Sequence, residues 1–204
     1  MATRYMRAVH YRDCVFQDVY YACVNAYQGQ IYDRCEFHGS GAPTALILAQ
    51  ASEGWVIARS CVFDGTGVST TAIRVNAWCH GVIAENCTFY DFSGAAIDCE
   101  TQLVVHNCIF KDCGYAFDVA SPLTAAYVES DYNCFHGCTH IATVNGSDYT
   151  TLASWQALVD ADSASPDANS LTDDPLLTDA ANDDFSLMAT SPCRYTGRGS
   201  GAVT

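Results

Sequence analysis

A pattern of an isoleucine or valine, a cysteine four residues later and a phenylalanine two residues after the cysteine recurs along this chain. Successive cysteines of the pattern are 21, 26, 26, 21 and 26 residues apart. Such a repeat is the sequence signature of a solenoid, because a single repeat cannot bury its own apolar face and must stack on its neighbours. The complete copies are Ile31/Cys35/Phe37, Ile57/Cys61/Phe63, Ile83/Cys87/Phe89 and Val104/Cys108/Phe110; shorter copies occur at Cys14/Phe16 and at Cys134/Phe135, where the residue between cysteine and phenylalanine is missing.

Each repeat holds two further apolar segments, such as Ala96-Ile97 and Gly81-Val-Ile83, and turn residues such as Ser93-Gly94 separate them. Three short strands per repeat, with no helical periodicity between them, predict an all-β protein: a parallel β-helix of about six coils. The interior of these coils is then lined by one cysteine and one phenylalanine per coil. This predicted ladder consists of Cys14, Cys35, Cys61, Cys87, Cys108 and Cys134 with Phe16, Phe37, Phe63, Phe89, Phe110 and Phe135.

Two rungs, Asn86-Cys-Thr-Phe89 and Asn107-Cys-Ile-Phe110, have an asparagine before the cysteine and an aromatic residue two positions after it. Through them the chain resembles the right-handed parallel β-helix proteins of the pectate-lyase type, over roughly residues 8–146. The resemblance implies a right-handed, single-stranded solenoid. The family includes both bacteriophage spike and surface proteins and polysaccharide-active enzymes, so the resemblance is specific for the fold and silent about chemistry.

Charged residues occupy the position two residues before the repeat cysteine, and their sign alternates from coil to coil. Opposite charges on neighbouring strands stabilise a stack modestly, and charges at this position must face water. The chain is therefore expected to bend between the isoleucine strand and the cysteine strand. The column reads Arg12, Asp33, Arg59, Glu85 and His106.

The twelve cysteines are interpreted as buried thiols, because most occupy repeat or apolar positions and side chains in a stack point in parallel, which is unfavourable for disulfides. Residues 1–146 are expected to form the coils and residues 147–204 a cap. In the second part, Leu152, Trp155 and Leu158 lie on one side of a short helix, which we expect to cover the last coil before an acidic, extended tail runs back along the solenoid. The first coil has only a few residues before it, so we expect another chain or an upstream segment to cover it.

The formal charge of −14 and the isoelectric point near 4.4 argue against nucleic acid as a partner. No apolar run approaches the ~18 residues that a membrane span needs, and the first residues lack the apolar core of a secretion signal. The resemblance implies a virion as the location, for a protein made without a signal peptide; secretion is the alternative.

Ionisable residues on the outward positions of one strand column are the candidates for catalysis. Stacked carboxylates on adjacent coils are compatible with glycoside hydrolysis or with holding a hard cation, but outward positions are usually polar only because they meet water. The candidates are Arg74, Asp98, Glu100 and Asp118. A second column, Asp18, Asp64, Asp91 and Asp112, follows the phenylalanines, where aspartate favours chain turns.

The catalytic signatures of the resembled enzymes are missing from the sequence. We predict no cofactor and no metal site, although calcium could bind the acidic tail at Asp160-Ala-Asp162, Asp173-Asp174 or Asn182-Asp-Asp184. A lyase or hydrolase of an acidic polysaccharide is the alternative function, with that polysaccharide as a possible ligand.

The residue between cysteine and phenylalanine should point outward, and it is β-branched in four coils of five. Such an apolar stripe is covered either by the tail or by another copy of the chain. Together with tyrosines in the first coils it forms the expected interface, which comprises Val15, Val62, Thr88, Ile109, Tyr20 and Tyr21. The sequence thus favours a non-catalytic structural or adhesive module of a larger assembly. The resemblance implies that the module is a homotrimer. Other chains of the assembly are expected to bind its first coil.

Overall fold

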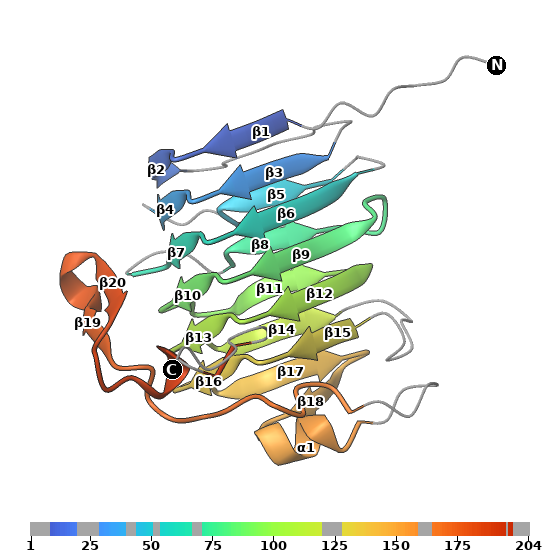
Figure 1. Ribbon diagram of the computed structural model, residues 1–204. Coiled ribbons are helices and arrows are strands. Elements are labelled where there is room, and N and C mark those ends of the chain that lie inside the picture. The colour runs from blue at the N-terminus through green and yellow to red at the C-terminus, as the bar shows by residue number, and fades with distance from the viewer. Residues whose placement is uncertain are drawn as a thin grey trace.

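The computed structural model of the chain describes residues 9–19, 29–39, 44–50, 54–66, 71–119, 128–158, 165–194 and 196–197. In this part of the chain, short strands wind around one core and stack into three sheets (Figure 1). Strands that are neighbours in a sheet come from successive repeats, and they pair in parallel. The chain is therefore a parallel β-solenoid.

The first sheet consists of β1 (Val9–Arg12), β3 (Gln30–Asp33), β6 (Trp55–Arg59), β9 (Gly81–Glu85), β12 (Gln102–His106) and β15 (Val128–Asp131). The second sheet consists of β2 (Val15–Val19), β4 (Glu36–Gly39), β7 (Val62–Asp64), β10 (Thr88–Tyr90), β13 (Ile109–Lys111) and β16 (Cys134–His136). The third sheet consists of β5 (Ile47–Ala49), β8 (Ile73–Val75), β11 (Ala95–Cys99), β14 (Tyr115–Val119) and β17 (His140–Val144), and β18 (Ser147–Tyr149) closes it in the antiparallel direction.

The count of six coils stays a prediction. The third sheet has five parallel strands among the described residues. The segment expected to supply the third strand of the first coil, around Ala22-Cys23, lies outside the described residues.

A stack of phenylalanine rings runs through the solenoid. From Phe16 to Phe135, neighbouring rings are nearly parallel, with centroids 4.6, 4.7, 4.8, 4.9 and 5.4 Å apart. These separations follow the ~4.8 Å spacing of paired strands. The rings from Phe37 onward are buried, whereas Phe16 in the first coil is only half-buried. The isoleucine or valine of the repeat lies on the outside of the first sheet, half-buried, because its strand neighbours on both sides point inward.

In the first five coils, a left-handed residue before the repeat cysteine makes the bend that the charged column predicts. Asp13, Arg34, Ser60, Asn86 and Asn107 have φ angles between 52° and 57°. The thiol that follows each of them donates to the backbone carbonyl two residues earlier, at 3.2 to 3.5 Å. A small side chain with a weak donor fits inside this bend. All eleven cysteines among the described residues are free thiols.

The last coil departs from the predicted ladder at Cys134. The register pairs Phe135 with Phe110 and Cys134 with Ile109, which is an outward position. Asn133 therefore takes the inner place beside Cys108, and its Oδ1 accepts from the Cys108 N–H at 2.8 Å. The assignment of Cys134 to the inner ladder is wrong because the missing spacer residue shifts the cysteine by one position and so turns it to the other face. Cys134 is nevertheless buried, because residues of the tail cover it.

The last coil is covered by the β18 hairpin and by α1 (Leu152–Gln156), which Thr151 caps (Figure 1). Trp155 of α1 is fully buried against Phe117 and Tyr149. The Trp155 indole N–H donates to the carboxylate of Asp167 at 2.7 Å. Within the described residues, no helix has the length and hydropathy of a membrane crossing.

The tail returns along the outside of the second sheet, as the orange and red ribbon in Figure 1 shows. It comprises β19 (Leu177–Asp179), η2 (Ala180–Asn182), β20 (Asp184–Leu187) and η3 (Pro192–Arg194). Its contacts move from β16 toward β4 as the chain proceeds to the hairpin. They join Thr172 to His136, Asp174 to Lys111, Phe185 to Tyr90 and Asp183 to His38.

Candidate functional site

The predicted acidic site lies on the third sheet. The register places Asp98 of β11 between Arg74 of β8 and Asp118 of β14. The Arg74 Nε donates to the Asp98 Oδ2 at 2.7 Å. Since paired strands are ~4.8 Å apart, these three side chains form one charged row, which we call the acidic row.

Glu100 lies beside this row and has a different role. Its Oε2 accepts from the backbone N–H of Ala77 at 3.1 Å, so it holds the turn that leads into β9. Its charge still contributes to raising the pKa of Asp98. We interpret Glu100 as a turn-stabilising residue at the edge of the acidic row.

Burial dominates the electrostatics of the acidic row. It raises the pKa of Asp98, and the adjacent Arg74 opposes this only in part, while Asp118 raises it further. Burial also raises the pKa of Asp118, with Arg74 opposing and Asp148 adding to the rise. Neighbouring carboxyls with raised pKa values can hold and transfer a proton, as an acid catalyst does. Arg74 forms an ion pair with Asp98, which makes it a poor candidate for a free base.

A histidine on β17, the strand beside β14, is not indicated by the repeat. His140 of β17 stacks on Tyr115 of β14, with ring centroids 4.5 Å apart and an interplanar angle of 11°. Its Nε2 lies 3.8 Å from the Asp148 Oδ2 on β18. The sequence signal that could have located Asp148 is Asn145-Gly146, a dipeptide typical of tight β-hairpins, and both residues have positive φ.

The outward stripe is exposed at one end and covered at the other. Val15 is 58% exposed, Val62 and Thr88 are half-buried, and Ile109 is only 9% exposed. The tail covers the Ile109 end where it passes β16 and β13, and its hairpin reaches as far as β4. Of the two covers expected for this stripe, the tail therefore accounts for its Ile109 end. Tyr20 and Tyr21 lie outside the described residues.

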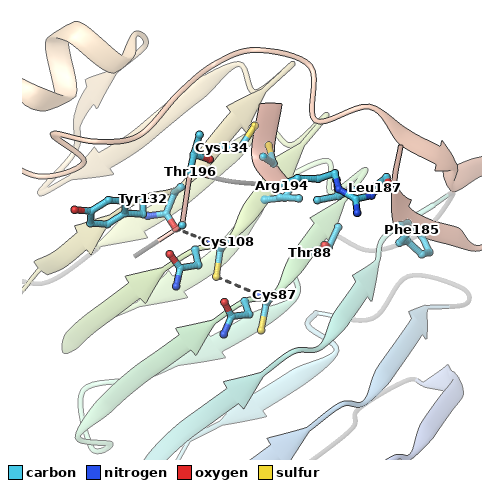
Figure 2. A pocket seen from close by; sticks show the side chains of 15 residues that line it. Cys87, Thr88, Cys108, Tyr132, Cys134, Phe185, Leu187, Arg194 and Thr196 are labelled. Atoms are coloured by element: carbon cyan, nitrogen blue, oxygen red, sulfur yellow. Dashed lines mark hydrogen bonds between the residues drawn. The ribbon is translucent and has the colours of Figure 1, made fainter. Parts of the chain in front are cut away.

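A pocket of about 520 Å³ lies between the tail and the outer face of the second sheet. Thr88 and Ile109 line it from the solenoid, and Phe185, Leu187 and Arg194 line it from the tail (Figure 2). The Arg194 guanidinium donates to the Leu187 carbonyl at 3.1 Å. The volume of the pocket is within the range of small-molecule sites, but such sites are lined mainly by apolar side chains and this pocket is not.

Two thiols meet beside this pocket. The hydrogen bond between Cys134 and Cys193, together with burial, raises the pKa of Cys134. A thiol with a raised pKa is a weak nucleophile at neutral pH, because the thiolate is the reactive form. We therefore assign Cys134 a packing role rather than a chemical one.

A different group of side chains could hold a metal ion. Among the described residues, the ligand atoms of His38, Asp64 and Asp183 all lie within 4.8 Å of one another. The sequence suggests only a turn role for Asp64 and a weak calcium role for the acidic tail. Asp91 and Asp112, from the same column as Asp64, do turn the chain, with φ angles of 55° and 58°.

The fold and its core define a class of protein, the right-handed β-helices. The family model for the right-handed β-helix region matches residues 4–155. The chain belongs to this family. No curated protein and no solved structure matches the chain.

Proposed function

We propose that this chain is a non-catalytic β-helix module that serves as a structural or adhesive part of a larger assembly. A virion is the setting that the resemblance to phage surface proteins favours, and a homotrimer is the assembly size it favours. The proposal rests on one observation, which is the contrast between the two ends of the solenoid.

The two ends differ in what covers them. At the last coil, Trp155 and Asp167 are fully buried under the cap. At the first coil, β1 and β2 are the outermost strands of their sheets, and no described residue pairs with their outer edges. Val9 and Val15 in these strands are 39% and 58% exposed. An uncovered strand edge with apolar neighbours is a site for pairing with another chain.

Strand geometry shows which backbone N–H groups face this edge. Val9 and Asp13 donate their backbone N–H groups to the second coil, each at 3.0 Å. Alternate N–H groups of a strand point to opposite sides, so those of His10 and Arg12 point to the open edge.

Sedimentation of the full chain tests the proposal. We expect a homo-oligomer, and we expect His10→Pro to reduce its population because proline removes one edge donor and adds bulk there. His10→Ala loses the same imidazole but keeps the N–H, so it should assemble like the wild type. A monomer at all concentrations whose His10 and Arg12 amides are protected from hydrogen exchange would contradict the proposal.

A second candidate function is the cleavage of an acidic polysaccharide at the acidic row, either by hydrolysis or by elimination. The raised pKa values of Asp98 and Asp118 favour it, whereas the Arg74 ion pair with Asp98 does not. Incubation with a panel of acidic polysaccharides should release no new reducing or unsaturated ends. Release that Asp118→Asn abolishes would establish the enzyme and overturn the non-catalytic proposal.

A further inference from the structure

An imidazole and two carboxylates meet where the tail hairpin touches the second sheet. His38 of β4 and Asp64 of β7 are direct neighbours in the sheet, and Asp183 comes from the turn between η2 and β20. The His38 Nδ1 lies 3.4 Å from the Asp64 Oδ2 and 3.7 Å from the Asp183 Oδ1. We call these three residues the His38 cluster.

The surrounding contacts orient the members of the His38 cluster. Asp64 is only 8% exposed, and its Oδ1 accepts from the backbone N–H and hydroxyl of Thr66 at 2.9 and 2.6 Å. The other oxygen, Oδ2, is thereby turned toward His38. On the far side of the imidazole, the Glu36 Oε2 lies 3.7 Å from Nε2. A carboxylate behind a histidine is the usual outer partner of a metal-binding imidazole.

The described residues bring more negative than positive charge to this site. Three carboxylates, those of Glu36, Asp64 and Asp183, lie around one imidazole ring. In the described part of the chain, no lysine or arginine lies within ion-pair distance of Asp64 or Asp183. A carboxylate that is largely buried, as Asp64 is, needs a positive partner to offset its lost hydration.

We propose that the His38 cluster binds a divalent transition-metal ion of the zinc type, which fastens the tail hairpin to the solenoid. Zinc takes imidazole nitrogen and carboxylate oxygen at ~2.0–2.1 Å in a tetrahedron, which places ligand atoms about 3.4 Å apart. The two distances from Nδ1, 3.4 and 3.7 Å, are close to this value, and all three ligand atoms lie within 4.8 Å of one another. Calcium fits less well, because it prefers six to eight oxygen ligands. Three protein ligands leave one position for water.

Metal titration of the full chain, freed of metal by a chelator, tests this site. We expect one zinc ion per chain to bind, with calcium and magnesium unable to displace it. Asp183→Asn should weaken zinc binding by more than about tenfold, and the backbone should tolerate it because asparagine accepts a left-handed φ, here 64°. His38→Ala should have the same effect.

His136→Ala is the matched control. His136 belongs to the same column of the second sheet and also contacts the tail, through the Thr172 carbonyl at 3.2 Å, but it is outside the His38 cluster. Its loss should leave zinc affinity unchanged. A second readout is hydrogen exchange of the β20 amides, which zinc should slow in the wild type and not in Asp183→Asn.

The cysteines are the competing zinc ligands, and cobalt substitution separates them from the His38 cluster. Cobalt held by nitrogen and oxygen lacks the intense thiolate charge-transfer absorption that sulfur ligation produces. We expect cobalt to bind without that absorption. Thiolate absorption, no binding, or equal affinity in the wild type and Asp183→Asn would overturn the proposal.

Discussion

In the first five coils, the residue before the repeat cysteine adopts a left-handed conformation, although none of these residues is glycine. Such a conformation costs most L-residues ~1–2 kcal/mol, and asparagine tolerates it best. Ser60 has φ 52° and Asn86 has φ 55°. The conformational free energy that the bend costs therefore differs from coil to coil.

We predict that Ser60→Gly stabilises the chain by about 0.5–1 kcal/mol, because glycine removes the steric cost of the bend but loses more backbone entropy on folding. Asn86→Gly should give a smaller gain. Urea unfolding of both variants measures the difference. A larger gain at Asn86 than at Ser60 would contradict the proposed cost of the bend.

The acidic row predicts a pH dependence of stability. A carboxyl whose pKa is raised on folding binds its proton more tightly in the folded state, so its contribution is complete below its ordinary value of 3.8 and is lost as the pH rises through the raised value. Asp118→Asn should therefore flatten the decline of the unfolding free energy above pH 3.8. Urea unfolding at a series of pH values measures the slope.

Asp13 provides a control of opposite sign. Its hydrogen bond with Arg34 lowers the pKa of Asp13, so its contribution is present above 3.8 and is lost as the pH falls through the lowered value. Asp13→Asn should therefore lower the stability above pH 3.8 and leave it almost unchanged at the acidic end of the series. The same pH profile for both variants would contradict the assignment.

At the level of single residues, the repeat predicts the core well and the surface clusters poorly. The burial of Phe63 and Cys61 follows from a pattern that recurs in every coil, because equivalent positions of stacked coils face the same side of the solenoid. Cys134 shows the limit, because one deleted spacer residue moves a cysteine to the opposite face. Asp183 lies close to Asp64 only because two segments that are distant in sequence pack together. The periodic pattern of the sequence does not predict this contact.

Among the elements, the cap depends on one buried carboxylate. Asp167 is fully buried, and its side chain accepts from Asn133, Ser170 and the Trp155 indole at 2.6 to 2.8 Å. These bonds join the last coil, the tail and α1. The sequence predicts the helix through Leu152 and Trp155, but it contains no sign of the carboxylate beneath it.

We predict that Asp167→Ala costs about 3 kcal/mol or more, because it leaves buried donors without an acceptor. In a solenoid each coil contacts only its neighbours, so the loss should be local. Hydrogen exchange should become faster in α1, β16 and β17 and should remain unchanged in β6 and β9. An equal increase along the whole chain would contradict a separate cap.

For the molecule as a whole, the three sheets form the sides of a solenoid whose last coil is covered and whose first coil has outer edges that no described residue pairs with. The coils place each outward side chain at a fixed distance from its counterparts, which suits repeated contacts with an assembly partner. The tail occupies one flank of the solenoid at the second sheet. The open first coil is therefore the place where the proposed partner should act.

Every assignment of an inward or outward column depends on the buried thiol ladder, and alkylation of the folded chain tests that ladder directly. Burial raises the pKa of Cys35 and Cys87, and both thiols are shielded by neighbouring coils. With site-resolved mass spectrometry at neutral pH, we expect Cys35, Cys61, Cys87 and Cys108 to remain unmodified until denaturant is added, while the half-buried Cys14 and Cys193 react first. Rapid modification of Cys61 or Cys87 in the folded chain would contradict the ladder.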